Sequence, residues 1–192
     1  PKWWMDLEMN TTYHDEKIGM DIPSTNMKRC AGFTDLYKRS FMMPLWTDVI
    51  IETKDDGSYK YWSRGEVEFE SHAPAQHGNS FQDNIHLKLL SPWLMKDKHG
   101  IEFLFIHPSY NQNTFLNRLT CLPGVLNFKY QRATHLNYMA RKEECRYEIE
   151  AGTPLVNIVP LSDMDVSIKC HIVSEPDWNL SLIHISEPTR PE

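Results

Sequence analysis

Apolar and polar residues alternate over many short stretches of this chain, and residues 85–89 and 146–150 are two clear examples. Alternation with a period of two is typical of β-strands that bury one face. The near-continuous apolar run at residues 101–106 is instead typical of a strand that is buried on both faces. The pattern predicts strands at residues 46–53, 59–63, 67–69, 85–89, 101–106, 124–130, 134–140, 146–150, 155–159 and 166–170.

Turn signals separate these stretches, for example at residues 54–58 (KDDGS) and 152–154 (GTP). Short strands with a turn about every 8–12 residues are typical of sandwiches and barrels. One segment differs, because Phe33 and Tyr37 lie four positions apart and share one face of a helix. The sequence therefore predicts an all-β sandwich or barrel of short, mainly antiparallel strands, with one short helix near residues 30–39.

The chain of 192 residues is long enough for one domain with a sizeable core, and 41% of its residues are hydrophobic. It contains no internal repeat, low-complexity tract or linker-like segment. Residues 1–27 are mixed and polar, with little periodicity, so we expect a loosely structured arm or an edge element there. Residues 28–179 are expected to form a single all-β domain.

The formal net charge is −6, which argues against general nucleic-acid binding because such proteins need a basic surface. No apolar run approaches the roughly 20 residues that span a bilayer, so no membrane partner is expected. No secretory signal is visible, and we expect a protein that is not secreted.

The C-terminal residues carry a separate resemblance. Residues 180–190 (LSLIHISEPTR) are similar to the translation of a transposase-type sequencing adapter. The resemblance implies that residues 180–192 are a non-native tail, and that the chain is a fragment read from environmental DNA. The alternative is a native strand at residues 180–185, whose apolar residues also alternate.

Three stretches, taken in order, carry a family resemblance: residues 85–93 (IHLKLLSPW), 100–108 (GIEFLFIHP) and 124–160, which closes with GTPLVNIVP. Together they resemble an uncharacterised all-β domain family of phages and environmental sequences. The resemblance covers roughly residues 28–162. It implies a location in the cytoplasm of an infected cell or in a virion.

The same order of segments resembles, more distantly, the β-clip fold of trimeric dUTPases. The turn at residues 124–127 (GVLN) and the strand at residues 149–157 carry this similarity, which implies a β-clip-like barrel and a homotrimer. Asn127 stands where the catalytic aspartate of that family would be, and an amide cannot take a proton from water. Only Ser109 echoes the Arg-Ser motif that contacts phosphate, because the arginine is missing.

Candidate metal and nucleophile sites are weak. His72, His77 and His86 lie close in sequence, but their spacing fits neither an HxH pair nor an HExxH helix, so we expect solvated surface histidines. No pair of cysteines is spaced as in a zinc site. Ser109 lies near His107, but no nucleophile elbow or third catalytic group accompanies them. We therefore expect neither a metal site nor catalytic residues.

We expect a phage-related structural or interaction module that is not an enzyme, needs no cofactor, and binds protein partners or itself. The first alternative is a nucleotide-binding or dUTPase-like protein, with Mg²⁺ carried by the substrate phosphates. Its site would be a cleft between subunits, formed by Ser109, Asn111, Asn127 and Tyr130. The second alternative is a carbohydrate-binding sandwich with exposed tryptophans, although Trp46, Trp62 and Trp93 are expected to pack in the core or on a sheet.

Overall fold

The computed structural model describes most of the chain. Asn111 and the expected tail at residues 180–192 lie outside the described residues. The chain divides into two compact units, residues 1–41 and residues 42–192, whereas the sequence pattern placed a division after residue 27. The structure describes residues 8, 10–77, 81–109, 118–174 and 176.

The first unit contains a β-hairpin and the helix. Strands β1 (Asn10–Asp15) and β2 (Met20–Thr25) pair antiparallel, and Gly19 closes their turn with a φ of 64°. The short 3-10 helix η2 (Met27–Arg29) follows, and then α1 (Ala31–Arg39). The predicted helix is confirmed, and its shared face is buried, with the rings of Phe33 and Tyr37 packed 4.6 Å apart.

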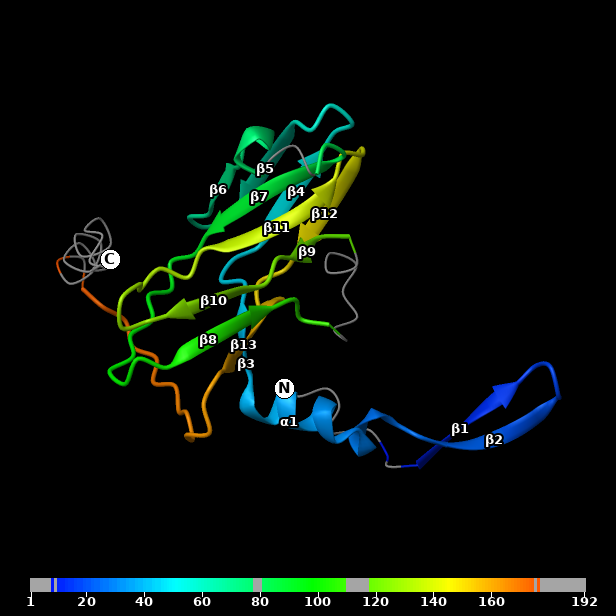
Figure 1. Ribbon diagram of the computed structural model, residues 1–192. Helices are drawn as coiled ribbons and strands as arrows, with labels where there is room; N and C mark the ends of the chain where they lie inside the picture. The colour runs from blue at the N-terminus through cyan, green and yellow to red at the C-terminus, as the bar shows by residue number, and fades with distance from the viewer. Residues whose placement is uncertain (1–7, 9, 78–80, 110–117, 175, 177–192) are drawn as a thin grey trace. The chain divides into compact units, whose positions relative to one another are not determined.

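The second unit is built from short antiparallel strands in three sheets (Figure 1). Their orders are β10-β8-β13-β3, β6-β7-β11-β9 and β12-β4-β5. Together with the β1–β2 hairpin this makes four sheets in the described residues, with no closed barrel, so the all-β, sandwich-like fold is confirmed. The elements are β3 (Phe41–Pro44), β4 (Val49–Thr53), β5 (Tyr59–Ser63), β6 (Glu68–Ser71), η3 (Pro74–His77), β7 (Asn84–Leu90), β8 (Glu102–Ile106), β9 (Thr120–Cys121), β10 (Gly124–Asn127), β11 (Leu136–Arg141), β12 (Cys145–Ile149) and β13 (Pro154–Pro160).

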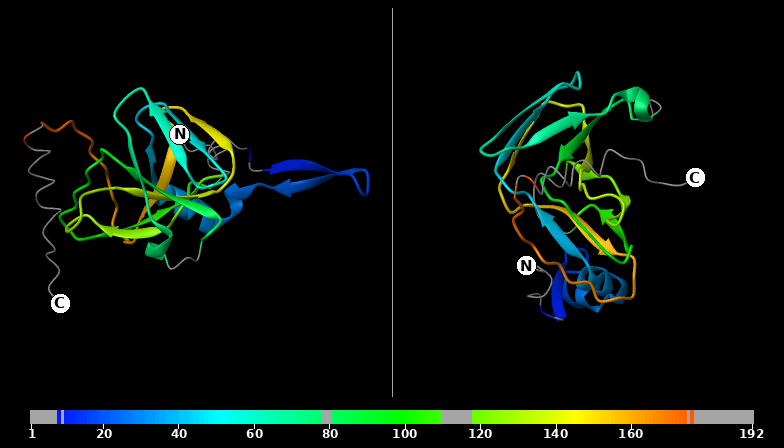
Figure 2. Two further views of the ribbon diagram at one scale, coloured as in Figure 1. Left: turned by 90° about the horizontal axis from the view of Figure 1, so that it is seen from above. Right: turned by 90° about the vertical axis from the view of Figure 1, so that its left-hand side faces the viewer.

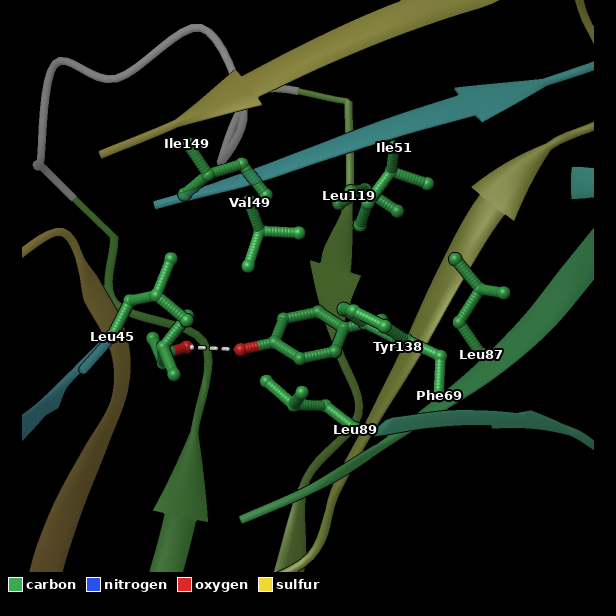
Figure 3. Close-up of a pocket in the computed structure, with 10 residues that line it drawn as sticks. Leu45, Val49, Ile51, Phe69, Leu87, Leu89, Leu119, Tyr138 and Ile149 are labelled. Carbon is green, nitrogen blue, oxygen red and sulfur yellow. Dashed lines mark hydrogen bonds between the residues drawn. The ribbon is translucent and has the colours of Figure 1, made fainter. Parts of the chain in front are cut away.

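Part of the core of this unit lies where the β12-β4-β5 sheet faces the β6-β7-β11-β9 sheet, and buried residues of β8 and β13 extend it. Val49 and Ile51 of β4 point toward Leu87 of β7 and Tyr138 of β11 (Figure 3). The Tyr138 hydroxyl donates a 2.9 Å hydrogen bond to the carbonyl oxygen of Leu155, which satisfies its polar atom inside the core. The cavity between these side chains has a volume of about 10 Å³, about one water probe, so it holds no organic ligand.

Strands β5 and β6 follow each other in the chain but belong to different sheets (Figure 2). The rings of Tyr61 in β5 and Phe69 in β6 pack edge to face, 5.1 Å apart, at this side of the sandwich. The Tyr59 hydroxyl also donates to the carbonyl oxygen of Phe69 across 3.4 Å. These contacts join the two sheets and leave the opposite face of β5 open to solvent.

One predicted strand is wrong. Residues 166–170 alternate between apolar and polar side chains, yet they form no strand and pair with none of the described strands. Val166 and Ile168 are 36% and 46% exposed. Alternation gives a stable strand only where a sheet edge supplies hydrogen bonds and a core covers one face. No helix among the described residues is long and apolar enough to cross a membrane.

Candidate functional site

An open groove lies at one edge of the β12-β4-β5 sheet, where β4 begins and β5 and β12 end. Val49 at the start of β4 pairs with Ser63 at the end of β5 and with Ile149 at the end of β12. This antiparallel register brings the residues beside each strand end together. The groove has a volume of about 570 Å³, within the range of about 300–1,000 Å³ that is common for ligand sites. Its lining includes Asp48, Ile50, Trp62, Arg64, Glu148 and Glu150.

Trp62 supplies the aromatic surface of the groove. Tyr59 and Tyr61 of β5 contact Phe69 of β6, so the alternation of the strand turns Trp62 to the other face. There it pairs with Ile50 of β4 and is 49% exposed. Trp62 therefore lies on a face of the sheet, which is one of the two places expected for it, and not in the core.

The other two tryptophans, also expected in the core or on a sheet, differ from each other. Trp93 is 40% exposed and lies outside the strands, so it is not a core residue. Trp46 is half-buried, and its Nε1 donates a 2.9 Å hydrogen bond to the carbonyl oxygen of Glu66. In the described residues, Trp62 is the single exposed aromatic residue that lines the groove.

Charged side chains surround Trp62, and carboxylates outnumber cations. Asp48 lies 3.5 Å from the guanidinium of Arg64, and its second oxygen accepts a 2.9 Å hydrogen bond from the amide of Ala151. These contacts fix the Asp48 carboxylate at the strand ends. The groove lining holds three carboxylates and one guanidinium, so its formal charge is −2.

The remaining two carboxylates of the lining differ in their partners. Glu148 accepts a 2.8 Å hydrogen bond from Arg146, whose guanidinium also binds Glu52 across 2.6 Å. Glu150 follows β12 and is exposed, and no ion pair of its carboxylate occurs among the described residues. Glu150 is therefore the carboxylate that remains available to a ligand. Neither the groove nor its charge was predicted from the sequence, because no local motif marks the meeting of three strand ends.

The candidate nucleotide residues lie elsewhere, in two places. Asn127 and Tyr130 share one turn, in which the Tyr130 amide donates to the Asn127 carbonyl oxygen. Asn127 pairs with Glu102 at the start of β8, whereas Ser109 lies beyond the end of this strand. The two ends of a five-residue strand are about 13 Å apart, so one chain does not gather Ser109 and Asn127.

Asn127 has a structural task in its turn. Its Nδ2 donates a 2.9 Å hydrogen bond to the carbonyl oxygen of Gly100, and its Oδ1 accepts a 3.1 Å hydrogen bond from the amide of Lys129. Tyr130 is 65% exposed. These hydrogen bonds fix the turn after β10.

His86 does not behave as a solvated surface group, so the expectation is wrong for this residue, whereas His72 and His77 are half-buried. The rings of His72 and His86 lie 4.5 Å apart, and the rings of His77 and His86 lie 5.9 Å apart. Both ring nitrogens of His86 are buried. In the part of the chain that the structure describes, no group of three metal-ligating side chains is placed to hold a metal ion.

Comparison of the chain with family models, with curated proteins and with solved structures found no match. The resemblances to a phage domain family and to the dUTPase β-clip therefore stay predictions. The groove and the histidine cluster must be interpreted from their own geometry.

Proposed function

We propose that this chain is a non-enzymatic interaction module that binds a basic segment of a partner protein in the groove beside Trp62. The observation that supports the proposal is an exposed tryptophan set among three carboxylates and one guanidinium. An aromatic face with excess negative charge favours a cationic side chain over a neutral or an anionic one. The net charge of −6 would also attract a basic partner from a distance.

The chemistry of such a contact is specific. A lysine or arginine side chain over the face of Trp62 gains about 0.5–1 kcal/mol at an exposed site. The Glu150 carboxylate can accept a charge-assisted hydrogen bond from the same cation. Arg64 lies at the same groove and would repel a second cation, which limits the groove to one basic side chain beside Trp62.

The test is a titration with a fluorescein-labelled peptide of alternating arginine and serine, followed by fluorescence anisotropy. The matched peptide carries citrulline in place of arginine and keeps the shape without the charge. We expect the arginine peptide to bind and the citrulline peptide to bind much more weakly. Trp62→Ala should weaken binding by about two- to fivefold, as expected for the loss of an exposed cation–π contact.

Trp93→Ala is the matched control, because Trp93 is similarly exposed but does not line the groove. Glu150→Gln should also weaken binding and reduce its dependence on salt. Equal binding by the Trp62→Ala and Trp93→Ala proteins, or equal binding of the two peptides, would contradict the proposal.

A carbohydrate ligand is the second candidate, since an exposed tryptophan with polar neighbours also suits the apolar face of a sugar ring. The two candidates differ in charge. Binding of neutral oligosaccharides that is lost in Trp62→Ala, without preference for the arginine peptide, would favour the carbohydrate.

The nucleotide alternative needs more than one copy of the chain, because Ser109 and Asn127 lie at opposite ends of β8. Thermal unfolding with dUTP and Mg²⁺, combined with a light-scattering mass, tests it. A ligand present at 100 times its Kd should stabilise the protein by about 2.7 kcal/mol. Such a shift in a trimer would contradict the interaction module.

A further inference from the structure

Three histidine rings gather on the face of the β6-β7-β11-β9 sheet that is turned away from the core. Leu87 and Leu89 of β7 are buried, so the alternation of the strand turns His86 to the other face. His72 follows β6, and its backbone amide donates a 3.1 Å hydrogen bond to the carbonyl oxygen of His86. His77 is the last residue of η3, and its ring lies 5.9 Å from that of His86.

The ring nitrogens of this cluster are poorly satisfied. Nδ1 and Nε2 of His86 and Nδ1 of His77 are buried, and the side-chain amide of Asn137 is a hydrogen-bonding group beside His86 that favours its protonated form. A neutral imidazole has one N–H and one acceptor nitrogen, whereas the protonated ring has two N–H donors and a positive charge. Burial with few acceptors therefore penalises the protonated form more than the neutral form.

The charged groups around His86 do not offset the cost of burying its protonated ring. Glu68 and Glu70 lie on β6, Lys88 on β7, and His135 and Arg141 at the two ends of β11. The carboxylate of Glu70 is bound to the Lys88 ammonium across 2.8 Å. Desolvation lowers the pKa of His86 most, and the charges of His72 and His77 lower it further, while the amide of Asn137 acts in the opposite direction.

We propose that His86, whose ring packs against those of His72 and His77, is the trigger of an acid-sensitive latch, which holds η3 against the sheet while His86 is neutral and releases it when His86 is protonated. In the open state the His86 ring reaches water and regains its ordinary affinity for protons. The open state therefore binds more protons below the ordinary histidine pKa of 6.5, and acid shifts the equilibrium toward it. For each unit by which closure lowers the pKa of His86, acid can shift the equilibrium between the closed and open states by up to tenfold.

The experiment is hydrogen exchange followed by mass spectrometry on the full chain at pH 7.5 and pH 5.5, corrected for the intrinsic exchange rate at each pH. The readout is the protection of the amides at residues 72–77, which includes the amide of Gln76 bonded to Ala73. We expect protection of this segment to fall about tenfold at pH 5.5, while the core strand β11 keeps its protection.

His86→Gln removes the titrating ring and keeps a polar side chain, and its protection at residues 72–77 should be independent of pH. His171→Gln is the matched control, because His171 is an exposed histidine outside the sheet, and it should respond as the original protein does. His72→Gln provides a second variant if His86→Gln fails to fold, and it should reduce the response to acid.

Two results would overturn the latch. One is protection at residues 72–77 that does not change between the two pH values in the original protein. The other is protection that rises with added Zn²⁺ at pH 7.5 and stays independent of pH without it, which would assign the cluster to metal binding.

Discussion

Asn157 is a fully buried amide on β13, and neither Nδ2 nor Oδ1 has a hydrogen-bond partner among the described residues. A buried polar group without a partner costs about 1–3 kcal/mol, and an apolar group of the same shape removes that cost. We predict that Asn157→Leu raises the free energy of unfolding by about 1 kcal/mol. Urea denaturation monitored by tryptophan fluorescence provides the measurement.

Asn127→Leu is the matched control, because both polar atoms of Asn127 are hydrogen-bonded. It should lower the free energy of unfolding by about 1–2 kcal/mol. If Asn157→Leu is as destabilising as Asn127→Leu, the Asn157 amide has a partner or a function that the fold needs.

Cys121 should be an unreactive thiol. It is buried, and desolvation raises its pKa to about 12, so almost no thiolate exists at pH 8. Cys30 and Cys170 are exposed. Alkylation with iodoacetamide at pH 8, followed by peptide mass spectrometry, should label these two residues and leave Cys121 unlabelled until the protein is unfolded. Labelling of Cys121 at the same rate as Cys30 in the folded protein would refute this prediction.

At the scale of elements, the turn between β4 and β5 depends on one glycine. Gly57 has a φ of 85°, and an added Cβ would lie 3.0 Å from the Lys142 side chain. We predict that Gly57→Ala lowers the free energy of unfolding by about 1 kcal/mol, because residues with a Cβ rarely adopt this conformation. Gly124→Ala should have little effect, since nothing lies within 4 Å of an added Cβ there. Thermal unfolding of both variants decides the comparison.

The strands of the second unit could largely be predicted because alternation reports burial directly. β5 coincides with the predicted residues 59–63, and the prediction at residues 85–89 falls inside β7. The β1–β2 hairpin was not predicted, because all but three of its strand residues are exposed and its strands have no buried face to mark. Periodicity also cannot say which of two alternating faces meets the core, and this is why the core and the sheet surface both stayed open for Trp62.

The candidate sites were less predictable than the strands. The groove needs Asp48, Trp62 and Glu150, and these residues come together only through the pairing of β4 with β5 and β12. The histidine cluster carried a sequence signal, since His72, His77 and His86 lie near one another in the chain. The burial of the His86 ring nitrogens had no such signal, because it depends on where η3 places the ring of His77.

At the scale of the whole molecule, stability should fall with acid in two separate ranges. Desolvation is the main cause that lowers the pKa of both His86 and His135 below 6.5, so the unfolded chain binds more protons as the pH falls below that value. Partial burial raises the pKa of Asp97, but hydrogen bonds from the amides of residues 99–101 outweigh it and hold the pKa below 3.8. Stabilisation by Asp97 is present above this value and is lost as the pH falls through the lowered pKa.

The measurement for this profile is the melting temperature Tm at pH values from 8 to 3. We expect a plateau above pH 6.5, a first decrease below it and a second decrease below pH 4. The double variant His86→Gln, His135→Gln should lose the first decrease and retain the second. A Tm that is constant between pH 7.5 and pH 5 would contradict the assignment to these histidines.

The small volume enclosed between the two facing sheets has a mechanical consequence. Hydrostatic pressure unfolds proteins largely because unfolding eliminates internal voids, and the volume change scales with those voids. The cavity beside Tyr138 contributes only about 10 Å³. Compression would therefore gain little by collapsing this part of the core, and kilobar pressure should change the surroundings of Tyr138 only slightly.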